Sequence, residues 1–263
     1  MQVVGNMQSV HVTAGVVAPH SAQVGKQVQE VWPHCSGDFR LYGTLSHALQ
    51  QCDPTHHVVL DFSVADACEN HLQACQQHHV AYVTGVTGLQ SAQYQALQQT
   101  AQTVPVLHAS NMSLGVNVLR VLCCLASQLL PEADIEILDL HHRVKRDHPS
   151  GTALWLARQM AKSRGWSAED CINSQPRKGI RNDKEIGIAS LRGGDERGQH
   201  TIHLLLQDEA LQLTHRTASR AVYAQGALLA CQYIVQQPAG LYNMQDVLKK
   251  FLHKNLQNIF NCL

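Results

Sequence analysis

The segment Asp139-Leu-His-His-Arg-Val-Lys-Arg-Asp-His-Pro-Ser-Gly-Thr-Ala-Leu154 joins two different hydrophobic patterns. Upstream of the histidines, residues 133–140 alternate apolar and polar side chains, which predicts a half-buried strand. Downstream, residues 152–162 have apolar side chains at helical spacing, with Pro149 before them and Ser150 as a natural N-cap. The segment is therefore predicted to run from the C-terminal end of a strand into the N-terminus of a helix.

The Ser150-Gly151-Thr152 turn is a candidate anion receptor. A helix N-terminus offers unpaired N–H groups and the positive end of the helix dipole, and Gly151 allows an anion to approach the backbone. Lys145 adds a cation nearby. Capping serines are common, so Ser150 taken alone could serve only to cap the helix.

The adjacent residues His141 and His142 follow the predicted strand. Neighbouring side chains at a strand end point to opposite faces, so the two imidazoles are not expected to share one metal ion. Two separate tasks fit them better. One histidine can transfer a proton at a reacting carbon, because an imidazole titrates near neutral pH, while the other orients the substrate.

Composition excludes several classes of partner and cofactor. The formal net charge is +0 and charged residues make up 15%, so neither nucleic acid nor a membrane is expected as a partner. The 9 cysteines form no C-x-x-C pair and follow no secretory leader, which favours reduced thiols in a cytoplasmic protein. No apolar run is long enough to span a bilayer. The 17 histidines are scattered without ligand spacing, so no metal is expected.

Strand and helix patterns alternate along the first part of the chain, which predicts a parallel sheet with ligands at the carboxyl ends of its strands. The expected strands lie at 10–17, 57–62, 80–84 and 104–108, and the expected helices begin near 42 and cover 67–78 and 91–103.

A long apolar helix at 113–130, closed by Pro131, is predicted to lead into a second domain. That domain should hold the 133–140 strand, the following helix, a polar loop at 165–183 and strands at 185–193, 199–207 and 210–215. In the middle strand of these three, Leu205 shares a face with His203, so both faces of the sheet are expected to be partly buried.

Two helices are expected to follow, at 219–235 and 246–263. The second has one apolar stripe and only three lysines on its polar face, so packing on the first domain or a partner subunit is favoured over membrane binding.

The residues from His141 to Ala153 resemble the signature of the dihydrodipicolinate reductase family, written H-H-x-x-K-x-D-x-P-S-G-T-A. The resemblance runs from about Val10 to Leu248. It includes, in order, the blocks Asp61-Phe-Ser, Gly85-Val-Thr-Gly, Ala109-Ser-Asn-Met-Ser-Leu-Gly-Val-Asn117, Leu191-Arg-Gly-Gly-Asp195 and Thr214-His-Arg-Thr-Ala-Ser-Arg220. Chance does not align six such blocks in order.

The resemblance implies an α/β fold with a Rossmann-like parallel-sheet nucleotide domain and an α+β substrate and oligomerisation domain. The first domain is expected to comprise residues 1–112 plus about 221–263, and the second residues 113–220. The family also implies a homotetramer. It usually ends near Leu248, so the segment that follows is additional.

The activity implied by the resemblance is reduction of a cyclic dicarboxylate imine by NADH or NADPH, in the diaminopimelate route to lysine. His141 corresponds to the proton donor and Lys145 to a residue that assists it. The substrate-binding positions are His142, Ser150, Gly151 and Thr152. The cofactor-binding positions are Gly85, Val86, Thr87, Ala109, Ser110, Asn111 and Met112, where Val86 replaces the family's usual Thr.

The N-terminus departs from the family, which opens with a strand, a loop ending Gly-Arg-Met-Gly and a helix. Only nine residues precede the predicted strand at 10–17, with Asn6 and Gln8 where the family has Arg and Gly. A βαβ unit needs roughly 30 residues, so the first unit is expected to be incomplete and NAD(P)H to bind weakly. Two alternatives are a non-catalytic binding or scaffold subunit and a reading frame begun at the wrong start.

Overall fold

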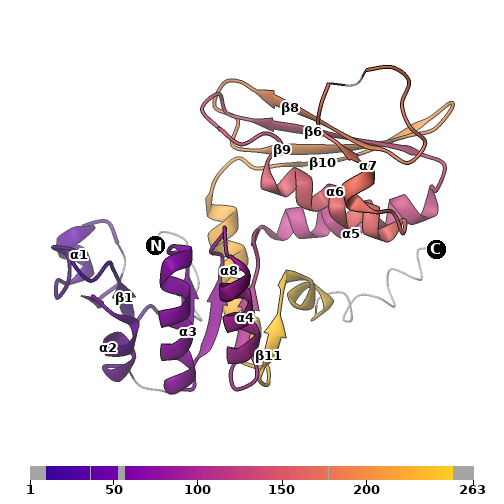
Figure 1. The fold of residues 1–263 in the computed structure, drawn as a ribbon. Coiled ribbons are helices and arrows are strands. Elements are labelled where there is room, and N and C mark those ends of the chain that lie inside the picture. The colour runs from indigo at the N-terminus through magenta and orange to yellow at the C-terminus, as the bar shows by residue number, and fades with distance from the viewer. Residues whose placement is uncertain (1–9, 36, 53–56, 177, 251–263) are drawn as a thin grey trace. The chain divides into compact units, whose positions relative to one another are not determined.

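The computed structural model describes residues 10–35, 37–52, 57–176 and 178–250 (Figure 1). The chain divides into two compact units. One combines Met1–Met112 with Tyr223–Leu263, and the other is Ser113–Val222. Both units contain helices and strands, as the α/β class requires.

The first unit is built on a parallel sheet with the strand order β11-β5-β4-β3. These strands are β3 (Val58–Asp61), β4 (Ala81–Thr84), β5 (Pro105–His108) and β11 (Gly240–Tyr242). Asp61 pairs with Thr84, and Thr84 pairs with His108, so three strands end at the same level. The segments that follow them therefore lie along one edge of the sheet.

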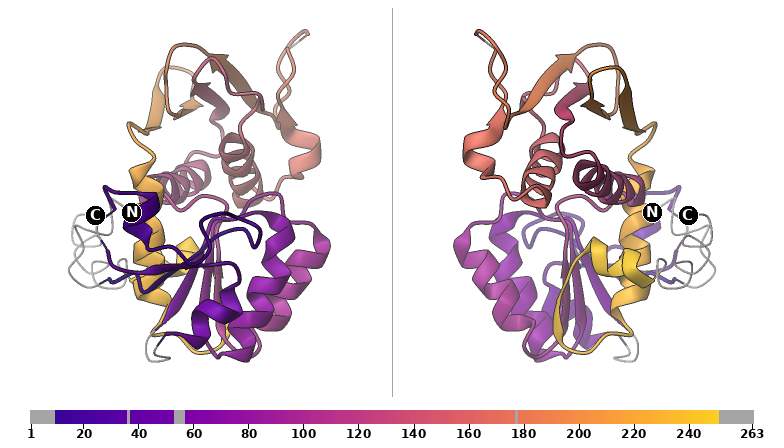
Figure 2. Two further views of the ribbon diagram at one scale, coloured as in Figure 1. Left: turned by 90° about the vertical axis from the view of Figure 1, so that its left-hand side faces the viewer. Right: turned by 90° about the vertical axis from the view of Figure 1, so that its right-hand side faces the viewer.

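Helices cover both faces of this sheet, as Figure 2 shows. On one face α3 (Cys68–Gln77) and α4 (Ser91–Thr100) pack against Tyr82 of β4. On the other face α8 (Ala221–Ile234) packs against Val83 of the same strand. Successive residues of a strand point to opposite faces, so a strand covered on both sides is apolar throughout, and this is why its sequence shows no alternation.

A small second sheet joins β1 (Ala14–Val16) and β2 (Arg40–Tyr42) in parallel. Between them lies the short helix α1 (Val28–Val31), and α2 (Leu45–Gln50) follows with Thr44 as its N-cap. The strand predicted at 10–17 is thus confined to three residues, and α1 and β2 were not predicted. Residues 1–9, on which the expectation of a missing glycine loop rests, lie outside the described residues.

The second unit is a mixed sheet with the strand order β10-β9-β6-β8-β7. Its strands are β6 (Asp134–His141), β7 (Ile172–Asn173), β8 (Ile186–Arg192), β9 (Gln199–Leu205) and β10 (Ala210–Arg216). The central strand β6 runs parallel to β8 and antiparallel to β9. Its burial alternates residue by residue, as the period of two predicted.

Two helices, α5 (Leu114–Leu129) and α6 (Gly151–Ser163), cover one face of this sheet (Figure 1). Ile135 and Ile137 of β6 point into the core that the helices close, together with Leu156 of α6. The face that carries Asp139 and His141 is the same one, because residues two apart on a strand share a face.

Several predictions about this unit and the C-terminal part were wrong in detail. The loop predicted at 165–183 contains α7 (Ala168–Cys171) and β7, since Cys171 is buried and Ile172 packs on the core. Leu205 is 38% exposed in the single chain, so the predicted partial burial of this second sheet face stays a prediction that depends on subunit contacts. Strand β11 was also missed.

The predicted helix at 246–263 lies outside the described residues from 251 onward. Its described beginning is buried, because Val247 packs in the core of the first unit with Met244. No helix in the described part of the chain is long and apolar enough to cross a membrane.

Candidate active site

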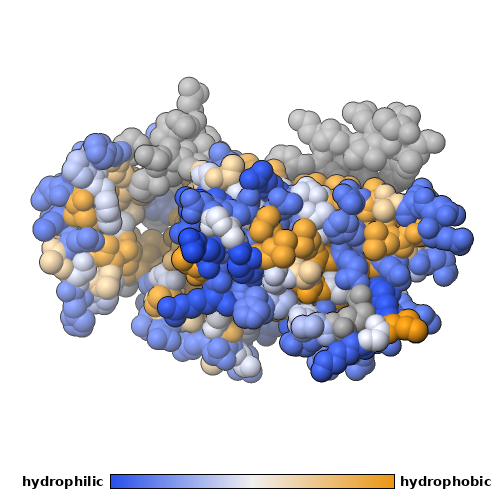
Figure 3. Space-filling view, turned by 90° about the horizontal axis from the view of Figure 1, so that it is seen from above, coloured by the Kyte–Doolittle hydropathy of each residue, from blue (hydrophilic) through white to orange (hydrophobic). Residues whose placement is uncertain are grey.

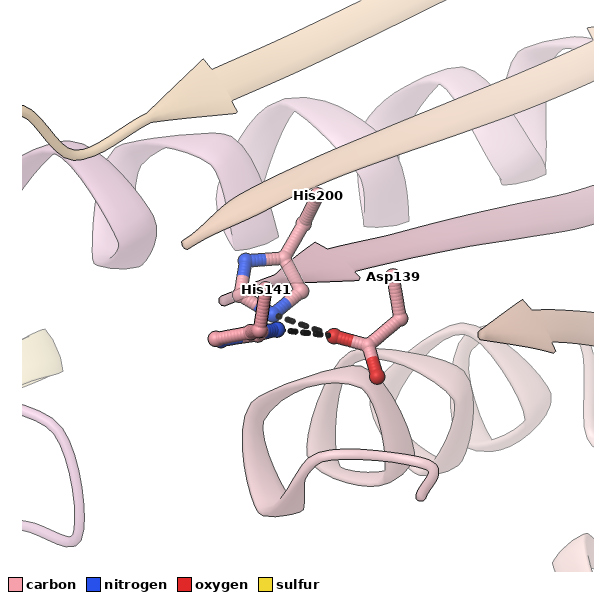
Figure 4. A group of neighbouring side chains, drawn as sticks. All are labelled: Asp139, His141 and His200. Atoms are coloured by element: carbon pink, nitrogen blue, oxygen red, sulfur yellow. Dashed lines mark ion pairs between the residues drawn. The ribbon is translucent and has the colours of Figure 1, made fainter. Parts of the chain in front are cut away.

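The carboxyl end of β6 places a carboxylate and an imidazole side by side. Asp139 and His141 are two residues apart on the strand, so both point toward the face covered by α5 and α6. Asp139 is 0% exposed and His141 is 9% exposed. The Nδ1 atom of His141 lies 2.9 Å from Oδ1 of Asp139 (Figure 4).

A second histidine reaches the same carboxylate from the neighbouring strand β9. The Nε2 atom of His200 lies 3.4 Å from Oδ1 of Asp139, and its ring meets that of His141 edge to face at 5.3 Å between centroids. His200 is buried. Figure 4 shows both imidazoles directed at one carboxylate oxygen.

The other oxygen of Asp139 is held by different donors. Oδ2 accepts hydrogen bonds from the main-chain N–H of Ser150 at 2.8 Å and from Nη2 of Arg192 at 2.9 Å. The Ser190 hydroxyl donates to it at 3.3 Å. Burial raises the pKa of Asp139, but the contacts with His141, His200, Ser150 and Arg192 outweigh burial and hold the pKa well below its usual range. Asp139 is therefore an ionised carboxylate in the protein interior.

The N-terminus of α6 begins beside this cluster, as the sequence predicted. The Ser150 hydroxyl caps the helix by accepting from the main-chain N–H of Ala153 at 3.2 Å. The same oxygen lies 3.1 Å from Nε2 of His200. Gly151 faces open space, since a Cβ there would meet nothing within 4 Å. Thr152 follows as the second residue of the helix.

Asp139, His141 and His200 together form a set of potential metal ligands, with one ligand atom from each residue lying within 4.8 Å of the others. The sequence analysis missed this set because its members come from two strands. However, the Arg192 guanidinium already neutralises the carboxylate, so a dication would bring a large excess of positive charge. We therefore interpret the set as two imidazoles in ion-pair contact with one buried carboxylate oxygen.

His142 and Lys145 lie in the turn after β6. The main-chain N–H of Lys145 donates to the carbonyl of His142 at 3.1 Å. The Lys145 ammonium donates to both carboxylate oxygens of Asp147, at 2.7 and 2.8 Å. This hydrogen-bonded ion pair lowers the pKa of Asp147. The Asp147 side chain is exposed, so the pair can open and release the ammonium toward a substrate.

An open groove of about 820 Å³ adjoins the end of β6, lined by residues 193–197 and 216–218 with Leu140. Its wall is tied to the strand, because the main-chain N–H of Gly193 donates to the carbonyl of His141 at 3.0 Å. Both stretches overlap blocks of the family resemblance, at 191–195 and 214–220, to which no role was assigned.

The predicted cofactor residues gather along one edge of the parallel sheet in the other unit. Residues 85–87 follow β4, and residues 109–112 follow the adjacent strand β5. The main-chain N–H of Gly85 donates to the carbonyl of Asp61, and that of Ala109 to the carbonyl of Thr84. Val86 and Met112 are buried, so a ligand at this edge would meet their main chain.

Gly85 has a packing reason to be a glycine. A Cβ at this position would overlap the ring of Phe62, which follows β3. Gly85 is therefore more than an ordinary turn glycine.

The structure thus brings His141, Ser150 and the start of α6 together in the unit Ser113–Val222, and groups the residues predicted to bind the cofactor in the other unit. Sequence reasoning missed Asp139, Arg192 and His200. The alternation of residues 133–140 puts Asp139 on the same strand face as Ile135 and Ile137, and a charged residue on the buried face of a strand is a signal that could have identified it.

Family models match nearly the whole chain. The model for the dihydrodipicolinate reductase N-terminus matches residues 1–112, and the model for the C-terminus of the same enzyme matches residues 115–248. The chain belongs to the dihydrodipicolinate reductase family. The resemblance inferred from the His141 segment is confirmed.

Named relatives agree with this assignment. The 4-hydroxy-tetrahydrodipicolinate reductase of Myxococcus xanthus is 38% identical over 241 residues, which covers 91% of this chain and 88% of that protein. The reductase of the same name from Zymomonas mobilis is 43% identical over 194 residues, which covers 73% of this chain and 76% of that protein.

Solved structures show the same fold. A dipicolinate-bound dihydrodipicolinate reductase from Paenisporosarcina has a TM-score of 0.73 at 22% identity, covering 92% of this chain and 91% of that one. An amine dehydrogenase from Mycobacterium smegmatis has a TM-score of 0.56 at 11% identity, covering 92% and 91%. The predicted fold class, a Rossmann-like parallel-sheet part and a second part with a mixed sheet, is confirmed.

Proposed function

We propose that the chain reduces 4-hydroxy-tetrahydrodipicolinate to tetrahydrodipicolinate with NADH or NADPH, in the diaminopimelate route to lysine. In this reaction water leaves the substrate, a hydride reaches C4 of the ring and a proton reaches C3. The observation that carries the proposal is the Asp139–His141 pair beside the N-terminus of α6, in a chain of the dihydrodipicolinate reductase family. One site then combines a proton donor with an anion receptor.

His141 is the proton donor. Its Nδ1 atom faces the ionised Asp139 carboxylate, so Nδ1 holds a proton and Nε2 is the atom that exchanges one with the substrate. Burial of the pair keeps this orientation fixed, because the surrounding side chains leave the ring little room to rotate.

The α6 N-terminus receives a substrate carboxylate. The Gly151 and Thr152 positions sit where the helix dipole is positive, and Gly151 faces open space into which an anion fits. Lys145, once released from Asp147, and His142 supply further donors from the turn before the helix. Two carboxylates on one small ring suit a site with separate cationic and dipolar donors.

The cofactor, when bound, supplies the hydride. The main chain of residues 85–87 and 109–112 forms the edge that fits a dinucleotide, because these residues follow adjacent parallel strands.

We further propose that the protein is a homotetramer of the reducing cytoplasm. The sheet face of the second unit opposite α5 and α6 carries Leu191, which is 50% exposed, and Leu205. Figure 3 looks onto this side and shows hydrophobic residues among hydrophilic ones. Burial of such a face between subunits is favourable.

All eight cysteines of the described residues are free thiols, which supports a reducing compartment.

The proposal is tested by following NAD(P)H oxidation at 340 nm while an upstream synthase supplies the substrate. We expect substrate-dependent oxidation that His141→Gln suppresses. A wild-type chain that binds dipicolinate but oxidises neither cofactor would instead support the alternative of a non-catalytic homologue.

A further inference from the structure

We propose that Asp139 is a positioning residue that couples the proton donor His141 to the anion-binding start of α6, and that His200 braces both. The inference rests on the function proposed above for the roles of His141 and of the helix N-terminus. It assigns a task to two buried ionisable groups that make no direct contact with a substrate in that scheme.

Burial of the Asp139 carboxylate has a cost in free energy. A carboxylate with no exposed surface is unfavourable unless donors surround it. Arg192 and the Ser190 hydroxyl satisfy Oδ2 from β8, the strand next to β6. If Asp139 only neutralised the charge of Arg192, an aspartate at an exposed position on the sheet would do this equally well. Its location two residues before His141 has to be explained by its remaining contacts.

The Oδ1 atom of Asp139 faces the two imidazoles. Its distance of 2.9 Å to Nδ1 of His141 brings a negative charge to one ring nitrogen only. A carboxylate favours the tautomer with the proton on the near nitrogen, and this leaves Nε2 for exchange with the substrate. An amide in place of the carboxylate would remove the charge that selects this tautomer.

Ser150 links the start of α6 to the same carboxylate. Its main-chain N–H donates to Asp139 over a sequence distance of 11 residues, so the same carboxylate fixes the first turn of α6 relative to β6. Because the start of α6 is hydrogen-bonded to one oxygen of this carboxylate and the His141 ring lies in ion-pair contact with the other, Asp139 limits how far the two can move apart.

His200 contacts Ser150, Asp139 and His141 at the same time. Its Nε2 atom lies 3.1 Å from the Ser150 hydroxyl and 3.4 Å from Oδ1 of Asp139, while its ring packs edge to face on His141. His200 thus touches all three members of the arrangement. Replacement of His200 by a smaller amide would loosen the helix cap and the proton donor together.

The test compares Asp139→Asn with Asp134→Asn. Asp134 lies on the same strand, but its side chain is 49% exposed and it pairs with Arg181 at 2.6 Å. We expect Asp139→Asn to lower kcat by roughly 10²-fold and to raise the Kd for dipicolinate several-fold, as for lost orientation of a general acid. The KM for NADH should stay within about twofold, and Asp134→Asn should change none of these values by more than that.

A second readout is independent of turnover. We expect ¹⁵N NMR of the wild-type protein to show His141 with its proton on Nδ1, and the Asp139→Asn protein to show a mixture of tautomers. A wild-type His141 with a bare Nδ1, or an Asp139→Asn protein with unchanged kcat, dipicolinate affinity and tautomer, would overturn the inference. If Asp139→Asn does not fold, His200→Asn takes its place, with losses of kcat and dipicolinate affinity expected.

These measurements also separate the two proposals. A wild-type protein with no reductase activity would refute the proposed function alone. The dipicolinate titration and the tautomer of His141 would still decide whether Asp139 couples the two halves of the site.

Discussion

Gly198 lies directly against the ring of His141: a Cβ at Gly198 would stand 3.0 Å from Nε2 of that ring. Its φ of +151° also favours glycine. We predict that Gly198→Ala lowers kcat by at least about tenfold, because the ring must shift from the position that Asp139 fixes, and small misplacements of reacting groups are costly. Steady-state kinetics on the folded variant measure the effect.

The control for this substitution is Gly165→Ala, which follows α6. Gly165 has a φ of +68°, but a Cβ there meets nothing within 4 Å. Gly165→Ala therefore adds a methyl group at a positive φ without contacting His141, and with less backbone strain than at Gly198, because a φ of about +60° lies in the left-handed region that L residues can adopt. A comparable loss of kcat in Gly165→Ala would show that contact with the His141 ring is not needed for the effect.

His141→Gln should lower kcat by roughly 10²–10⁴-fold while the fold is kept, the range typical for removal of a general acid. Glutamine retains a polar side chain opposite Asp139 but supplies no group that titrates near neutral pH. Turnover assays on the soluble variant, with circular dichroism as the test of folding, decide the point. A variant as active as the parent would remove His141 from the mechanism.

Thr152→Val should raise the KM for the dicarboxylate substrate and leave cofactor affinity nearly unchanged. A hydroxyl that donates to a carboxylate forms a charge-assisted hydrogen bond worth about 1.5–3 kcal/mol. Valine has nearly the same shape, so the packing of the first turn of α6 is kept. Separate titrations with dipicolinate and with NADH measure the two affinities. Equal weakening of both ligands would place the hydroxyl elsewhere in the mechanism.

Asp61 gives the stability of the first unit a dependence on pH. Burial raises the pKa of Asp61, but hydrogen bonds from His71, Tyr82 and Ser63 outweigh it and leave the pKa below its usual range. A folded-state pKa below the unfolded value of about 3.9 means that the contribution is complete above that pH and is lost as the pH falls through the folded pKa.

We therefore predict that Asp61→Asn destabilises the protein by about 1–3 kcal/mol at pH 7, since it disrupts hydrogen bonds to a buried charge. The difference from the wild type should shrink as the pH falls below about 4. Urea unfolding at a series of pH values provides the measurement. A difference that is the same at pH 7 and at the lowest accessible pH would show that the charge of Asp61 contributes nothing.

The sequence predicts the long elements because their signals are local. Ser113 and Pro131 bracket the helix predicted at 113–130, and the structure places α5 at Leu114–Leu129. The alternation before His141 likewise predicts β6 to within one residue. The elements that were missed, such as β11 and β7, have three and two residues, too few for any period to appear.

The sequence predicts only the residues of the candidate site that lie in one segment of the chain. His141, Ser150 and Thr152 stand in one continuous segment, so their association follows from chain order. Arg192 and His200 reach Asp139 from β8 and β9 only after the sheet has formed, with 53 residues separating Arg192 from Asp139. No pattern within a single segment contains that pairing.

Gly85 has no side chain, and the ring of Phe62 occupies the space that a Cβ would need. A Cβ at Gly85 would overlap the Phe62 ring, so Gly85→Ala requires this ring to move. Phe62 is 52% exposed, so its ring can swing outward and disturb the edge proposed to hold the cofactor. Gly85→Ala should therefore destabilise the first unit and raise the Kd for both NADH and NADPH.

A double-mutant cycle with Phe62→Ala isolates this contact, because residues in contact are not additive whereas independent ones are. Once the ring is absent, the added methyl group meets no obstacle from it, so Gly85→Ala should cost less than about 0.5 kcal/mol in that background. Thermal unfolding and calorimetric titration with each nucleotide measure the four proteins of the cycle. Strict additivity would mean that the Phe62 ring does not oppose the added methyl group, and that Phe62 has no part in shaping this edge.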